Sequence, residues 1–258
     1  MSEMALRFSA DAGRGNPETA LPASNFASNV LDLLERVDYR RCDRGEDLEA
    51  IYRLRYKSYL ASGMVSANPS RMVTDTLDDL PNSMRFGIHI DGVLVSTLRL
   101  HHVTKAERVS PSTTVYGDIL QPRIDAGETF IDPSRFAADP EWTAQYPYLP
   151  YVTLRLAAMA CKFFEPDYCL STIRPDHAAF YKRVFDAKQV GDERPYPALN
   201  YHVVLYQAHY ASIAARTGLR FPFFKSTDFE QRMMFGKPTH GDLEPLTILP
   251  TAKFMAAA

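Results

Sequence analysis

The stretch FIDPSRF, residues 130–136, decides the fold prediction. Its apolar residues are typical of a β-strand, yet an aspartate and an arginine stand three residues apart with a proline between them. In a regular strand, Asp132 and Arg135 would point to opposite faces of the sheet, because successive side chains alternate. Proline donates no ladder hydrogen bond and is confined to edges and bulges. We therefore expect a bulge at Pro133 that turns both side chains toward one cleft.

Two elements upstream of this strand each carry an arginine among apolar residues. Residues 45–63 predict a helix that ends near Gly63, with Arg55 on its apolar stripe. Farther along, Asp91-Gly92 between two apolar runs is the signature of a type I′ hairpin, and Arg99 lies in line with apolar residues of its second strand. Snorkelling or a structural ion pair is the alternative to a functional role for such arginines.

Downstream, helical and strand patterns alternate. Residues 150–166 predict a buried helix stopped by a proline, 167–175 a strand, a helix follows with Asp176 as N-cap, and 200–210 predict another strand. This order predicts an α/β (α+β) sandwich with a mixed sheet. We expect residues 1–25 to form a flexible arm, 26–206 the main domain, and 207–258 a helical and aromatic extension packed on it.

Composition narrows the class of partner and the compartment. The net charge of −2 provides no general attraction to nucleic acid or to an anionic membrane. Cys42, Cys161 and Cys169 are an odd number without CxxC spacing, which favours a reducing cytoplasm and predicts no metal site. The longest apolar stretch is interrupted by Lys162, so no integral membrane segment is expected.

Five segments, taken in order, resemble a known family: YRLRYKSYL, DTLDDLPNS, DGVLVSTLRL, FIDPSRF and TIRPDHAAFYKRVF. Over residues 40–206 the chain is similar to the N-acyl amino acid synthases, relatives of the LuxI-type acyl-homoserine lactone synthases in the GNAT-like N-acyltransferase fold. The resemblance implies a bulged middle strand and helices on both faces of the sheet. It also implies transfer of a long fatty acyl chain from the phosphopantetheine arm of acyl carrier protein to the amino group of an amino acid, with no bound cofactor.

The resemblance also implies a charged cluster at the cleft. Carried over residue by residue, its members are Arg55, Asp75, Asp78, Arg99, Asp132 and Arg135. This chain departs from the lactone synthases in having aspartate instead of glutamate in the strand and an insert before that strand. These departures favour an amino acid acceptor over S-adenosylmethionine. The glycine-rich loop of coenzyme A-dependent relatives is missing before the main helix, which favours a carrier protein as donor.

Acyl transfer to an amine needs a base, because an α-amino group with a pKa of about 7.7–8.0 is mostly protonated at neutral pH. Asp132 is the first candidate, with Asp75 and Asp78 as the others. Nearby arginines would lower the pKa of a carboxylate and weaken it as a base, so an organising ion pair is the alternative role for Asp132. Arg99 or Arg135 is expected to bind the carboxylate of the acceptor.

The donor would need an apolar channel and a docking surface. Channel candidates, for which core packing is the alternative, are Phe130, Phe136, Leu154 and Phe180, and Ser134 is a further substrate-binding candidate. Acyl carrier protein is acidic, and the segment YKRVFDAK presents Lys182, Arg183 and Lys188, which otherwise form a solvated basic face.

Two other functions stay open at this point. One is a lactone synthase that consumes S-adenosylmethionine. The other is a non-catalytic module that binds acyl carrier protein or lipid, which would hold the carrier without releasing its thiol.

Overall fold

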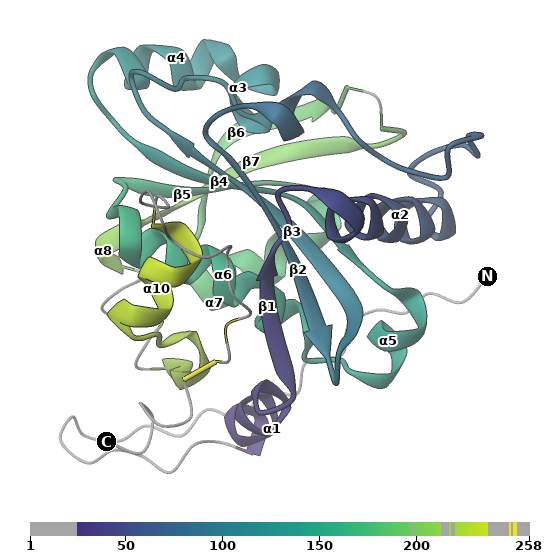
Figure 1. Ribbon diagram of the computed structural model, residues 1–258. Coiled ribbons are helices and arrows are strands. Elements are labelled where there is room, and N and C mark those ends of the chain that lie inside the picture. Colours follow the sequence, from purple (N-terminus) through teal and green to yellow (C-terminus); the bar gives the residue numbers. More distant parts are fainter. Residues whose placement is uncertain are drawn as a thin grey trace, which may run out of the picture.

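A computed structural model describes residues 25–197, 199–212, 217, 220–236, 248 and 250–251. Its centre is a seven-stranded mixed sheet with the strand order β1-β2-β3-β4-β5-β7-β6 and with helices on both faces (Figure 1). The predicted α/β sandwich with a bulged middle strand is therefore confirmed. Apart from Asn25, the predicted N-terminal arm lies outside the described residues.

The strands alternate with helices along most of the chain. The strands are β1 Val37–Arg41, β2 Ser83–Ile90, β3 Val93–Val103, β4 Phe130–Ala138, β5 Tyr168–Ile173, β6 Lys188–Pro195 and β7 His202–His209. The helices are α1 Asn25–Leu34, α2 Gly45–Ala61, α3 Pro111–Val115, α4 Gly117–Asp125, α5 Pro140–Gln145, α6 Leu149–Phe164, α7 Ala178–Phe185, α8 Tyr210–Ser212 and α10 Asp228–Phe235, with 3₁₀ turns η1 Thr76–Asp79, η2 Pro175–His177 and η4 Pro222–Phe224.

The two faces of the sheet carry different layers. Helix α6 packs on β3 and β4 and anchors the main core, which also takes in α1, α7 and α10. Helix α2 packs on β3 and β4 from the opposite face, where α3 also contacts β4 and β5. Adjacent residues of β4 show the division, because Ile131 belongs to the main core and Phe130 to a second core with Tyr116 and Leu120 of the α3–α4 segment.

Several predicted elements are confirmed and several need correction. Helix α2 ends before Gly63, and the turn at Asp91-Gly92 has the positive φ angles of 50° and 79° that a type I′ turn requires. Strands β1 and β6 were not predicted, and the insert before β4 folds into α3 and α4. Asp176 lies inside η2 and does not cap α7, whose N-cap position is taken by His177.

The bulge in β4 lies two residues beyond the predicted position. Pro133 pairs regularly with Leu100, whereas the register shifts between the pairs Arg99–Ser134 and Thr97–Ala137. The extra residue is supplied at Arg135, whose φ of 52° lies in the left-handed region used by the first residue of many bulges. The prediction of a kink at Pro133 was therefore wrong in position, although the bulge does bring Arg135 to the face covered by α2, where Asp132 and Ser134 lie by regular alternation.

The C-terminal residues that the structure describes contact the main domain through a buried ion pair. Nη1 of Arg155 in α6 lies 2.6 Å from Oε1 of Glu230 in α10, and both side chains are buried. Arg155 also donates to the carbonyl oxygens of Phe223 and Lys225. Strand β7 runs to His209, three residues beyond the predicted end of the domain at 206. The domain boundaries otherwise stay a prediction.

None of the described helices is both long enough and apolar enough to cross a bilayer.

Candidate active site

Three arginines and two loop carboxylates meet on the face of the sheet covered by α2. Arg55 Nη1 lies 2.9 Å from Asp78 Oδ1, and Arg99 Nη1 lies 3.1 Å from the same oxygen. Arg99 Nη1 also lies 2.6 Å from Asp75 Oδ1, while Arg135 Nε donates to Asp75 Oδ2 over 3.1 Å. The structure thus brings together the predicted cluster members from α2, η1, β3 and β4.

The turn η1 itself fixes the orientation of both carboxylate side chains, independently of the arginines. Asp75 is its N-cap and accepts from the backbone N–H of Leu77, and the Asp78 side chain accepts in return from the N–H of Asp75. This reciprocal capping box holds the two side chains in one orientation. Asp78, Arg55 and Arg99 are essentially withdrawn from solvent, so each depends on its partners for compensation of lost hydration.

Electrostatics within this cluster hold Asp75 in its charged form. Burial would raise the pKa of Asp75, but hydrogen bonds and charge from Arg99, and then from Arg135, hold that pKa well below its ordinary value. Burial also lowers the pKa of Arg55, against the attraction of Asp78. Asp75 is therefore an ion-pair partner first, and a poor base.

Asp132 occupies a different environment from the one predicted. Among the described residues, no hydrogen bond or ion pair joins it to an arginine. Its Oδ2 accepts from the backbone N–H of Ser112 over 2.8 Å, and its Oδ1 accepts from Ser112 Oγ over 2.7 Å. Burial raises its pKa, against hydrogen bonds from Ser110 and Ser112 and a weaker effect of Arg99. Arg99 does lower the pKa of this carboxylate, as expected, but burial outweighs that effect and the net shift is upward.

Asp132 lies at a fork in the sheet. Strands β4 and β5 run parallel and pair only at Phe130–Tyr168 and Ile131–Cys169. Beyond Ile131, β4 continues against β3 alone, and β5 continues against β7. From Asp132 onward, β4 and β5 no longer pair with each other, and Asp132 itself pairs with His101 of β3.

Arg135 has hydrogen-bonding capacity to spare. Its guanidinium is bound to Asp75 through Nε and Nη2, but the buried Nη1 has no partner within the described residues. Tyr59, Tyr196 and Tyr201 surround it closely enough to interact electrostatically with it. A buried guanidinium nitrogen without an acceptor is costly, and it can be satisfied by an anionic ligand.

Tyr201 connects this arginine to an open groove. The groove has a volume of about 460 Å³ and forms where the end of α2, the start of η2 and the β6–β7 hairpin meet. Its lining includes Gly63, Met64, Arg174, Asn200 and Tyr201. Tyr201 interacts electrostatically with both Arg135 and Arg174, so it lies between the groove and the cluster.

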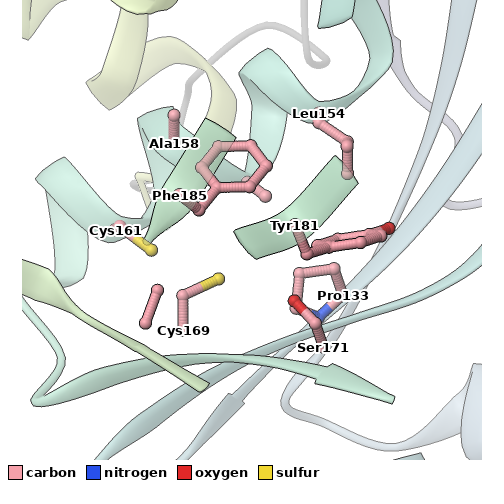
Figure 2. Close-up of a pocket in the computed structure, with 10 residues that line it drawn as sticks. Pro133, Leu154, Ala158, Cys161, Cys169, Ser171, Tyr181 and Phe185 are labelled. Carbon is pink, nitrogen blue, oxygen red and sulfur yellow. The ribbon is translucent and has the colours of Figure 1, made fainter. Parts of the chain in front are cut away.

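An apolar pocket lies on the opposite face, beneath the fork (Figure 2). Its free volume is about 20 Å³, enough for about one water molecule. Figure 2 shows Pro133, Ser171 and Tyr181 at one end and the sulfurs of Cys161 and Cys169 at the other. Small side chains of α6 and β7 complete the lining, namely Ala157, Ala158 and Ala208.

Of the predicted channel residues, the pocket takes in only Leu154. Phe130 packs in the second core under Arg123, whose guanidinium carbon lies 5.0 Å from the ring centroid. Phe136 and Phe180 pack against the main core, and Ser134 accepts a hydrogen bond from Arg99 Nε over 3.0 Å. These side chains have packing or positioning contacts, which was the alternative role for the phenylalanines.

The three predicted docking cations are exposed at the end of α7 and the start of β6. Lys182 Nζ lies 5.4 Å from the ring centroid of Tyr206, and Lys182 and Arg183 follow Tyr181, which lines the apolar pocket. Lys188 begins β6. Two of the three cations therefore follow directly in sequence on a residue that lines the pocket.

Sequence reasoning missed Ser112 and Thr172. Ser112 Oγ lies 2.6 Å from Thr172 Oγ1 of β5, so this serine contacts a strand on each side of the fork. One signal was available, because Ser110-Pro111 followed by Thr113 is a helix-start pattern. That pattern predicts a short helix in the insert but does not show that the helix reaches Asp132.

Comparison with solved structures identifies the fold. FeeM, an N-acyl amino acid synthase from uncultured soil microbes, superposes with a TM-score of 0.60 at 19% identity, covering 72% of this chain and 97% of that one. TofI, solved in a ternary complex with an inhibitor and MTA, superposes with a TM-score of 0.50 at 14% identity, covering 71% and 99%. No curated protein sequence matches the chain.

The fold and the family match together define the class of protein, an N-acyltransferase. The family profile described as N-acyl amino acid synthase FeeM matches residues 50–209, more than half of the 258 residues. The chain belongs to this N-acyl amino acid synthase family. The family match starts within α2 and ends at the last residue of β7, so it contains all six charged residues of the predicted cluster.

Proposed function

We propose that the protein transfers a long fatty acyl chain from acyl carrier protein to the amino group of an amino acid, giving an N-acyl amino acid. One observation carries this proposal. Asp132 lies at the strand fork, where its carboxylate has a raised pKa and accepts hydrogen bonds from Ser112. The arginines of the neighbouring cluster form their ion pairs with other aspartates, Asp75 and Asp78. Membership of the family supports the same reaction class.

The raised pKa of Asp132 suits a general base. The acceptor enters as an ammonium ion and must lose one proton before its nitrogen can attack, and a base is more effective when its pKa is closer to that of the amine. The free amine then forms a C–N bond to the thioester carbonyl carbon. The C–S bond breaks, and the leaving thiolate takes the second amine proton to give the carrier thiol. Backbone N–H groups at the fork are the candidates for stabilising the oxyanion.

The unpartnered Nη1 of Arg135 is suited to the carboxylate of the acceptor. Arg99 is fully buried and already bound to Asp75, Asp78 and Ser134, so it has less capacity for a ligand. Arg135 keeps a donor without a partner among the described residues, near Tyr201, which lines the open groove. We therefore assign acceptor binding to Arg135 and a positioning role to Arg99.

The apolar pocket is the candidate site for the fatty chain. Its present volume of about 20 Å³ is too small for such a chain, so binding requires Tyr181 and Phe185 of α7 to move apart from α6. A carrier protein is favoured over coenzyme A because residues 139–149 before α6 contain no glycine to cradle a pyrophosphate. The exposed cations Lys182, Arg183 and Lys188 would face the acidic carrier.

The test is an amine-dependent acyl transfer assay. Purified protein is incubated with acyl carrier protein loaded with acyl chains of different lengths and with each amino acid in turn. Released thiol is measured, and the product is identified by mass spectrometry. The expected result is thiol release that requires both an amino acid and the enzyme, together with an N-acyl amino acid product.

The variant Asp132→Asn separates catalysis from folding. Asparagine keeps the shape and can still accept from the Ser112 N–H, so the thermal unfolding midpoint should stay near that of the wild type. The kcat is expected to fall by about 10²–10⁴. Near-normal turnover of a folded variant would remove Asp132 as the base. Consumption of S-adenosylmethionine would instead identify a lactone synthase, and tight carrier binding without thiol release would identify a binding module.

A further inference from the structure

We propose that Thr172 and Ser112 form a hydrogen-bonded path that carries a proton from the acceptor amine to Asp132. The inference rests on the proposed function, because it supplies the route by which that base is reached. Thr172 and Ser112 relay the proton in this path, and Asp132 is its end point.

Asp132 cannot meet the substrate directly as the protein stands. Its side chain is 0% exposed, and both of its oxygens are occupied by Ser112. Ser112 is itself fully buried, whereas Thr172 is partly exposed on β5, past the point where β4 and β5 separate. Of the three residues in this chain of contacts, Thr172 is the one that solvent and substrate can reach.

The direction of the hydrogen bonds follows from the chemistry of the end group. An ionised carboxylate only accepts, so the single hydroxyl proton of Ser112 must point to Asp132 Oδ1, 2.7 Å away. The 2.6 Å contact between Ser112 Oγ and Thr172 Oγ1 then requires Thr172 to be the donor. Each hydroxyl donates toward the carboxylate, which is the arrangement needed to deliver a proton to it.

The proton balance is complete with the groups present. A proton leaves the acceptor ammonium, directly or through one cleft water, and binds Thr172 Oγ1 as the threonine passes its own proton to Ser112. Ser112 passes its proton to Asp132 Oδ1 in the same way. The net change is one ammonium and one carboxylate converted into one free amine and one carboxylic acid, and the acid later returns its proton to solvent.

Several groups set the charge around this end point. Arg99 and His101 face Asp132 from β3, and Tyr196 follows β6 on the same side. Burial lowers the pKa of His101 to about 3, and its Nε2 lies 3.0 Å from the carbonyl oxygen of Leu77. His101 is therefore neutral at physiological pH, and burial likewise raises the pKa of Tyr196 to about 12. Burial raises the pKa of Asp132 itself above its ordinary value.

A purely structural role for Ser112 makes a different prediction. The backbone N–H of Ser112 also donates to Asp132, so it anchors α3 to β4 without help from the hydroxyl. The variant Ser112→Ala keeps this anchor but removes both the proton path and the hydroxyl hydrogen bond that lowers the pKa of Asp132. Thr172→Val removes the other hydroxyl at nearly constant shape, and Thr172→Ser restores it.

The experiment compares the pH dependence of acyl transfer in these variants between pH 5 and 9. The wild type should show an acid limb set by Asp132. In Ser112→Ala and Thr172→Val, kcat should fall at least about tenfold with little change in KM. Their acid limb should move up to the pKa of the acceptor amine itself. Thr172→Ser should recover both rate and profile.

A matched control is Ser96→Ala on the opposite face. Ser96 is a buried serine whose Oγ accepts from Thr153 over 2.8 Å, and its loss should leave the pH profile unchanged. Wild-type profiles in Ser112→Ala or in Thr172→Val would overturn the path while leaving the proposed function in place. If Ser112→Ala does not fold, the Thr172 pair decides alone. A wild-type protein that acylates no amine would overturn the proposed function, and the path with it.

Discussion

Arg135 binds Asp75 from a backbone conformation that arginine rarely adopts. Its φ of 52° places it in the left-handed region, where a side chain with a Cβ atom pays an energetic cost of about 1 kcal/mol or more. Glycine is the residue that bulges normally place at such a position. An arginine is found there in spite of the strain, and its Nη1 has no partner among the described residues. This indicates that the site requires the guanidinium group at this position.

The variant Arg135→Gly tests this relationship. Glycine suits the bulge, so relief of strain should offset part of the lost ion pair with Asp75, and the unfolding midpoint should change little. The KM for the amino acid is expected to rise at least about tenfold, the equivalent of about 1.4 kcal/mol, with a much smaller effect on the KM for the acyl carrier. Arg135→Lys keeps the charge but not the paired donors, and should be intermediate. An unchanged KM for the amino acid in Arg135→Gly would show that Arg135 does not bind the acceptor.

Asp75 should make stability depend on pH in the acid range. Arg99 and Arg135 face it and, against burial, hold its folded pKa below the unfolded value of about 3.9. Between those pKa values the unfolded chain binds more protons, so stability rises with pH. The contribution of Asp75 is fully present above about pH 4 and is lost as pH falls through its folded pKa. Urea titrations between pH 2 and 7 should show a shallower acid slope for Asp75→Asn.

Asp79 provides the control for this measurement. Its side chain is 84% exposed in the same turn, so Asp79→Asn should keep the acid slope of the wild type. Equal slopes for Asp75→Asn and the wild type would mean that the ion pairs of Asp75 do not differ in strength between folded and unfolded states.

Asp78 compensates two buried arginines at once. The Asp78→Asn variant leaves Arg55 and Arg99 with less negative charge in a site that water does not reach. Breaking a buried ion pair by removing one partner typically costs about 3–5 kcal/mol. The free energy of unfolding from urea titration should fall by about that amount, and the double variant Arg55→Met, Asp78→Leu should lose less. A loss below about 1 kcal/mol in Asp78→Asn would contradict a structural role for the pair.

The elements that the sequence predicted well are those set by local patterns. Helix α2 and the hairpin at Asp91-Gly92 follow from periodicity and turn chemistry, and they place Arg55 and Arg99 correctly. Strand β6 has the sequence KQVGDERP and was not predicted. It is an edge strand with mostly exposed side chains, so its sequence lacks the alternation of apolar and polar residues that indicates a strand. Its neighbour β7 was predicted because its side chains are mostly buried.

The chemistry around Asp132 depended on contacts that no local pattern contains. The resemblance grouped it with the arginines, but Ser112 is 20 residues away along the chain and Thr172 is 60 residues from Ser112. The bulge was placed at Pro133 because proline lacks a ladder donor, although proline can also end up paired where its missing N–H faces away from the partner strand. Arg135 adopts the left-handed conformation because tertiary contacts at the site hold it there, and no local sequence pattern predicts such contacts.

Phe185 should control the length of acyl chain that the protein accepts. It lines the apolar pocket from α7 and is half-buried, so Phe185→Ala enlarges a space that is otherwise nearly filled. Each additional buried methylene contributes about 0.8 kcal/mol, or roughly fourfold in kcat/KM. Competition between acyl carriers of different chain length should show a shift of the preference toward longer chains. Phe229→Ala, at a position 63% exposed on α10, should keep the wild-type preference. The pocket would be excluded as the acyl site if both variants had the same chain-length profile.

The basic face of α7 should govern recognition of the carrier protein and not of the acyl group. Reversing Lys182 and Arg183 to glutamate places negative charge beside Tyr181, where an acidic carrier would approach. The KM for acyl carrier protein is expected to rise at least about tenfold at low salt, and its dependence on ionic strength should flatten because long-range attraction is screened within about 8–10 Å. A short acyl-pantetheine surrogate has no such charge, so its KM should stay the same. Lys105→Glu makes the same kind of charge reversal at an exposed position before α3 and should change neither value. If the double reversal affects the surrogate as strongly as the carrier, then the two cations act on the pocket itself, and the carrier docks elsewhere.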